Sequence, residues 1–170
     1  MHLLRDALPP ARGRAALRAA AVCLGSAFRG DDAVGPLAAA RLREAGATVL
    51  DCADEPTRLL DLWADLDPLV VVDAVITGAP AGTLHRAESS HAPLPRDLRL
   101  ASTHAVGVAD ALELGRALGR APRRVVVLGI EGARFGMGDE ITPAVAKTLD
   151  ELVTAALTEL GLEEPCTSAR

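Results

Sequence analysis

A continuous apolar run that carries one carboxylate near its end most constrains the fold of this chain. Residues Leu69 to Ala74 read Leu-Val-Val-Val-Asp-Ala, with β-branched residues at the middle of the run. Such a run is typical of a central strand in a parallel sheet, which is buried on both faces. A partly buried Asp73 then needs a partner for its charge, which could be a structural hydrogen bond or a cation.

Short apolar runs alternate with longer amphipathic stretches from Ala20 onward, which is the pattern of a parallel sheet covered by helices. We therefore predict an α/β fold: a three-layer sandwich with a mostly parallel, twisted sheet of about five strands and helices on both faces. Strands are expected near residues 20–24, 47–50, 69–74, 83–87 and 124–130, and helices near 37–45, 59–66, 103–118 and 143–160. Asp67-Pro68 is expected to end the second of these helices.

The composition describes one folded domain. The 170 residues are 49% hydrophobic and 24% charged, with a formal net charge of −5, which excludes the disordered and fibrous classes. We expect residues 1–18 to be a loose N-terminal extension, 19–161 the domain and 162–170 a mobile tail. Basic residues are scattered among acidic ones, so no nucleic acid is expected as a partner.

The cysteine and hydropathy patterns favour the cytoplasm. Cys23, Cys52 and Cys166 are an odd number without close spacing, which fits neither a disulfide framework nor a zinc cluster. Arg14 and Arg18 interrupt what would be a signal core, and no run approaches the ~18 apolar residues of a membrane span. We expect a monomer that does not bind membranes.

Candidate functional residues follow the predicted strands. The carboxyl ends of parallel strands form the ligand-binding edge of such a sheet, and Asp31, Asp32 and Asp73 fall there. One residue of the Asp31-Asp32 pair could instead cap the following helix. His104 begins another helix, where the helix dipole favours a neutral imidazole that can bind metal, although a surface histidine is the more common case.

Two carboxylates and one imidazole suit zinc, nickel, iron or manganese. The devices of serine hydrolases and zinc proteases, G-x-S-x-G and H-E-x-x-H, are absent from the sequence,. A dinucleotide turn built on Gly25, Gly30 and Gly35 is rejected on its spacing, and because Asp31-Asp32 would repel a pyrophosphate. No organic cofactor is expected.

Four short blocks occur in order between about Ala20 and Leu160. Together they resemble the hydrogenase maturation endopeptidases, and their compatible spacing makes the resemblance specific. The blocks are Leu24–Gly35, Val71–Val75 with Ala81–Thr83, Ser102–Gly107, and Gly129–Gly132 with Ile141–Pro143.

The resemblance implies an endopeptidase that removes the C-terminal extension of a nickel-iron hydrogenase large-subunit precursor after nickel insertion. The metal is then supplied by the substrate, and Asp32, Asp73 and His104 match the family's metal-contacting residues. Asp32 stands where many relatives carry Glu. Two alternatives stay open: a non-catalytic nickel-binding assembly factor, and a peptidase for another substrate such as the related spore-germination proteases.

Two aromatic residues lie in loops after the first and last strong strands. Phe28 and Phe135 each neighbour an arginine, Arg29 and Arg134, which suggests a grip on an extended peptide. Packing of these rings onto the core is the alternative, because isolated aromatics readily bury area.

Overall fold

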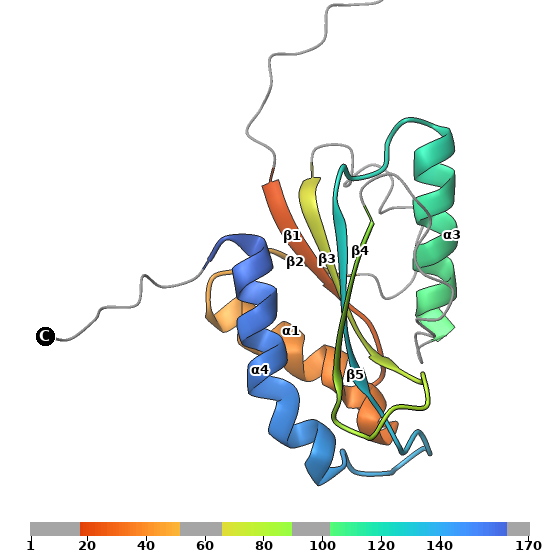
Figure 1. Cartoon of the computed structure of the whole chain (residues 1–170), viewed down its shortest axis with the longest axis vertical. Helices are drawn as coiled ribbons and strands as arrows, with labels where there is room; N and C mark the ends of the chain where they lie inside the picture. The colour runs from red at the N-terminus through yellow and green to blue at the C-terminus, as the bar shows by residue number, and fades with distance from the viewer. Residues whose placement is uncertain (1–17, 52–65, 90–102, 163–170) are drawn as a thin grey trace, which may run out of the picture.

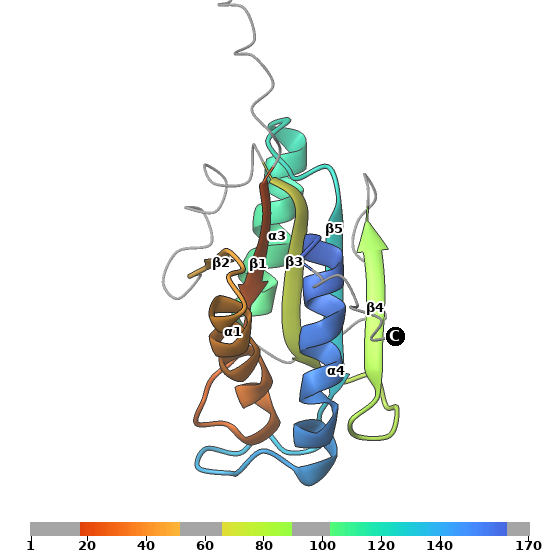
Figure 2. The same ribbon diagram turned by 90° about the vertical axis from the view of Figure 1, so that its left-hand side faces the viewer.

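A five-stranded sheet forms the centre of the computed structural model, which describes residues 18–51, 66–89 and 103–162 (Figures 1 and 2). The strand order is β2-β1-β3-β5-β4, and β4 alone among these strands runs antiparallel to its neighbour. This mostly parallel sheet confirms the predicted fold class. The strands are β1 (Arg18–Cys23), β2 (Val49–Leu50), β3 (Leu66–Val75), β4 (Leu84–Ser89) and β5 (Val125–Glu131).

Helices cover both faces of the sheet and complete the three layers. Figure 1 shows α1 (Val34–Glu44) and α4 (Pro143–Leu160) on one face and α3 (Thr103–Ala117) on the other. All three begin near the carboxyl ends of the parallel strands. In the part of the chain that the structure describes, no helix is both long and apolar enough to cross a bilayer.

The two apolar cores follow from the alternation of side chains along β3. Val70 and Val72 pack with α1 and α4, whereas Leu69 and Val71 pack in the cluster that holds Leu112 of α3. Burying each such side chain is worth about 1.5–3 kcal/mol. Because alternate residues share a face of a strand, Asp73 lies on the same face of the sheet as Leu69 and Val71, which is the face that α3 covers.

The prediction that Asp67-Pro68 ends a helix is wrong, because both residues lie within β3. Pairing with β1 shifts at this point: Arg18 pairs with Leu66, whereas Ala20 pairs with Leu69. Such an irregularity tolerates a proline, which has no N–H to donate. Leu66, expected at the end of that helix, begins the strand, and the rest of the helix lies outside the described residues.

Other predicted boundaries are close to those observed. Pro36 lies in the first turn of α1 and Gly46 follows its end with φ +83°, as expected for a glycine that terminates a helix. Thr142 occupies the N-cap position of α4 and Pro143 the first helical position. The Thr142 side chain itself makes no capping hydrogen bond.

Candidate functional site

Asp32 sits in η1 (Gly30–Ala33), a single 3₁₀ turn that joins β1 to α1. The approach of η1 to the end of β1 depends on Gly25, which has φ +121°. A Cβ atom on Gly25 would lie 2.1 Å from the backbone oxygen of Asp32 and 3.2 Å from its Oδ1. A side chain at this position would therefore push Asp32 away from the sheet.

The Asp32 carboxylate is 1% exposed and only partly satisfied by its neighbours. Its Oδ2 accepts a hydrogen bond from the backbone N–H of Ser26 at 3.0 Å and lies 3.4 Å from Nη1 of Arg29. Its Oδ1 is buried and has no hydrogen-bond partner among the described residues. A buried carboxylate oxygen without a partner is costly, so this atom is a candidate for ligand contact.

Asp73 is fully buried near the end of β3. Val72 accepts a hydrogen bond from the N–H of Leu24 at 2.8 Å, so Asp73 directly follows the last contact between β3 and β1. The η1 turn also lies against β3. The structure thus places Asp32 and Asp73 at the same carboxyl edge of the sheet, as the sequence predicted.

His104 lies in the first turn of α3, at the same edge of the sheet (Figure 1). Its backbone is therefore on the face toward which Asp73 points. The His104 side chain is outside the described part of the structure, and the described side chains contain no group of three His, Cys, Asp or Glu residues arranged to hold a metal. The three-residue metal contact stays a prediction.

Cys23 at the end of β1 is not a nucleophile of this edge. Burial, together with the negative charge of Asp73, outweighs the opposing effect of Arg43 and raises the pKa of its thiol to about 12. The thiol is therefore protonated at neutral pH, and thiols react as thiolates.

Asp31 does not cap a helix, which corrects the alternative raised for the Asp31-Asp32 pair. The N-cap of α1 is Ala33, and neither η1 nor α1 has a side-chain cap. The Asp31 carboxylate is instead buried and accepts hydrogen bonds from three backbone N–H groups beyond β5. Burial alone would raise the pKa of Asp31, but the N–H groups of Ala133, Thr142 and Arg134 outweigh it and lower the pKa,.

Glu131 was missed as a candidate, although it ends a continuous apolar strand in the same manner as Asp73. It is the last residue of β5 and is 2% exposed. Its carboxylate accepts hydrogen bonds from Thr77 and Gly78 after β3 and lies 3.2 Å from Nε2 of His85 on β4. Applying the strand-end argument to residues 125–131 would have found this cluster.

The two loop aromatics have different environments. Phe28 is 72% exposed, whereas Phe135 is partly buried and packs on the core. Core packing is therefore the correct interpretation of Phe135 and the wrong one for Phe28. Met137 is 77% exposed and precedes Gly138, whose N–H donates to the Phe28 carbonyl at 2.8 Å. Phe28 and Met137 thus lie on neighbouring loops.

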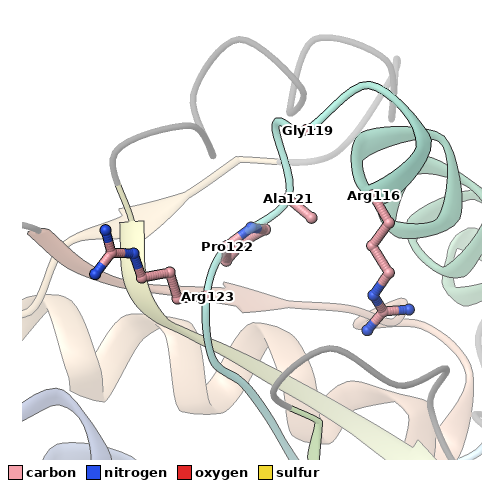
Figure 3. Close-up of a pocket in the computed structure, with 5 residues that line it drawn as sticks. All are labelled: Arg116, Gly119, Ala121, Pro122 and Arg123. Carbon is pink, nitrogen blue, oxygen red and sulfur yellow. The ribbon is translucent and has the colours of Figure 1, made fainter. Parts of the chain in front are cut away.

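A cavity of about 340 Å³ lies at the opposite edge of the sheet, between the end of α3 and the start of β5 (Figure 3). Arg116 and Arg123 extend to either side of the connecting loop rather than toward each other. Arg116 also donates hydrogen bonds to the side chains of Glu113 and Ser89. The cavity is remote from Asp32 and Asp73 and offers no convergent charge. Its described lining residues are Arg116, Gly119, Ala121, Pro122 and Arg123.

Solved structures share the fold. The maturating endopeptidase HybD of Escherichia coli superposes with a TM-score of 0.71 at 23% identity, over 85% of this chain and 94% of that one. The [NiFe] hydrogenase maturation protease HybD of Thermococcus kodakarensis gives a TM-score of 0.70 at 25% identity, over 83% and 97% of the two chains.

Sequence relatives and a family model agree with this likeness. The hydrogenase expression/formation protein HupD of Thiocapsa roseopersicina is 30% identical over 68% of this chain, and the match spans 50% of that protein. HupD of Rhodobacter capsulatus is 26% identical over 81% of this chain and 68% of its own length. The model of the hydrogenase maturation protease family matches residues 33–159. This chain therefore belongs to the hydrogenase maturation protease family.

Proposed function

We propose that this protein is an endopeptidase that removes the C-terminal extension of a nickel-iron hydrogenase large-subunit precursor after nickel has been inserted. Family membership supports a protease of hydrogenase maturation, and the precursor, the extension and the requirement for nickel are our proposal. We also propose that it acts in the cytoplasm, as a monomer, and with no organic cofactor.

We assign contact with the substrate-held nickel to Asp32, Asp73 and His104. The observation that carries this assignment is the buried Oδ1 of Asp32, which has no hydrogen-bond partner among the described residues. Carboxylate oxygen and imidazole nitrogen are both suitable ligands for nickel. The metal then serves as a recognition tag, and cleavage depends on whether the precursor is loaded.

The same carboxylates permit peptide hydrolysis. One of them accepts a proton from a water molecule while the water oxygen attacks the scissile carbonyl carbon. The C–N bond then breaks, and the leaving amine takes up a proton. A metal ion beside the carbonyl would favour this attack by polarising it.

Incubation of the purified protein with nickel-loaded and nickel-free precursor tests the proposal. Mass spectrometry should show loss of the extension from the loaded form alone. If both forms stay intact while the loaded form binds, the protein is the alternative, a nickel-binding assembly factor. Cleavage of both forms would contradict recognition through nickel.

Isosteric variants test the assigned residues. Asp32→Asn and Asp73→Asn should each lower the cleavage rate at least about 100-fold, within the range that general acid-base groups contribute. Asp150→Asn is a matched control, because Asp150 is an exposed acid on α4 that pairs with Arg41. Unchanged cleavage by both site variants would contradict the assignment.

A further inference from the structure

The segment that carries Asp32 is fastened to the loop between β5 and α4. Figure 2 shows this loop, residues 132–142, running beside the connection from β1 to α1. Asp31 provides the main attachment: its Oδ2 accepts from the N–H groups of Ala133 and Arg134 at 2.8 and 3.0 Å, and its Oδ1 accepts from Thr142 at 2.7 Å.

Backbone hydrogen bonds from Asp31 and from the preceding Gly30 add to this attachment. Asp31 donates its N–H to the Arg134 carbonyl at 2.8 Å, and Gly30 donates to the Asp139 carbonyl at 3.1 Å. The packing leaves no spare room, because a Cβ on Gly30 would lie 2.6 Å from the Arg134 oxygen. The 132–142 loop therefore holds η1 in one position against the loop.

The chemistry of this contact requires a carboxylate. Two oxygens that only accept can bind three N–H donors, and the fully buried Asp31 side chain does so. An asparagine amide has one acceptor oxygen, so its NH₂ group would face at least one of these N–H groups. Loss of even one buried partner loosens the contact.

We propose that Asp31 is a positioning residue, which clamps η1 to the 132–142 loop and so holds the neighbouring Asp32 carboxylate in one geometry toward the precursor. This inference rests on the proposed function. Asp31 itself touches neither substrate nor metal in this scheme. Its effect reaches the reaction through Asp32, because an error of about 1 Å in a reacting group can lower a rate about 100-fold.

The test compares Asp31→Asn with two controls in the full-length chain. Glu140→Gln changes another acid of the same loop, whose side chain is exposed. Leu152→Ala truncates a buried core residue on α4, ten residues along the helix from Thr142, and reports the effect of lost stability alone.

Two readouts separate positioning from stability. In Asp31→Asn, the amides of residues 133, 134 and 142 should exchange with solvent at least about tenfold faster, given the strength of hydrogen bonds to charged groups. The kcat for nickel-loaded precursor should fall at least about tenfold with little change in KM, because precursor binding is retained while Asp32 is misplaced. Both controls should keep the wild-type kcat.

Unchanged amide exchange or unchanged kcat in Asp31→Asn would overturn the inference, as would an equal loss of kcat in Leu152→Ala. If the wild-type protein cleaves no precursor, the proposed function fails separately. Exchange of the Asp32 amide, which donates to the Arg29 carbonyl at 3.2 Å, then becomes the second readout: faster exchange in Asp31→Asn than in both controls supports positioning of Asp32, and unchanged exchange overturns it.

Discussion

Glu131 at the end of β5 holds the loop that follows β3, and its charge makes a testable contribution to stability. Its Oε1 accepts from the N–H groups of Thr77 and Gly78 at 2.8 and 2.9 Å, and its Oε2 accepts from the Thr77 hydroxyl at 2.8 Å. Burial alone would raise the pKa of Glu131. The Thr77 hydroxyl, these N–H groups and nearby His85 outweigh burial and hold the pKa below its ordinary value of 4.5.

The sign of the pH dependence follows from this lowered pKa. A carboxylate with a lower pKa in the folded state stabilises the fold fully above the unfolded-state value, and the contribution is lost as pH falls through the folded-state value. Wild-type stability should therefore be lower at pH 3.5 than at pH 7,. The free energy of unfolding of Glu131→Gln should fall less steeply over this interval, because the glutamine amide does not titrate.

The magnitude differs between two substitutions. In Glu131→Gln the amide oxygen can keep both N–H bonds and the NH₂ group can donate to the Thr77 hydroxyl, so the cost at pH 7 should be about 1 kcal/mol. Glu131→Ala removes the carboxylate that accepts from the N–H groups of Thr77 and Gly78, and each of these two hydrogen bonds to a charged group is worth about 1.5–3 kcal/mol, so about 3–6 kcal/mol should be lost.

Urea unfolding followed by far-ultraviolet circular dichroism at pH 7 and pH 3.5 measures both effects. Glu151→Gln, at an exposed position of α4, is the control and should change stability by less than about 0.5 kcal/mol. Equal pH slopes for the wild type and Glu131→Gln, or equal costs for the Gln and Ala variants, would refute the reasoning.

Two further predictions concern the loop after β1. Phe28→Ala should leave the urea midpoint unchanged, because the ring is 72% exposed, and should weaken precursor binding about tenfold or more if the ring is buried in the complex. Leu118→Ala is the control, because Leu118 is 58% exposed at the opposite edge and its loss should leave binding unchanged. An unaltered affinity of Phe28→Ala would contradict a contact between Phe28 and the precursor. Gly25→Ala should lower the free energy of unfolding, measured by thermal unfolding, by at least about 2 kcal/mol, because of its positive φ and the close approach of Asp32,. Gly138→Ala should cost less, because Gly138 has φ +83° but nothing lies within 4 Å of the added Cβ. Equal costs would argue against steric displacement of Asp32.

The fold was predictable because its strongest signal is periodic and local. Continuous apolar runs such as Leu69 to Val72 identify the buried parallel strands,, and their carboxyl ends identify the edge where Asp32 and Asp73 lie. Pro68 led to a wrong prediction, because the irregular pairing between β1 and β3 accommodates a proline within β3. That shift depends on the partner strand and has no local signature.

The role of each acidic residue was less predictable than its place. Asp31 and Asp32 are neighbours with the same side chain, yet one binds three N–H groups about a hundred residues away and the other keeps an oxygen without a hydrogen bond among the described residues. Local capping preferences favoured a helix cap for one of them. Tertiary contacts overrode this preference, and a single sequence does not encode such contacts in a short pattern.

The contact between Asp31 and Thr142 joins residues 111 positions apart in the chain. Contacts of such long sequence separation form slowly, because a large loop must close before they contribute. During synthesis Asp32 and Asp73 emerge from the ribosome well before Thr142 and α4. We therefore expect the edge of the sheet that holds Asp32 and Asp73 to assemble late in folding, when α4 docks, long after both of these residues have been synthesised,.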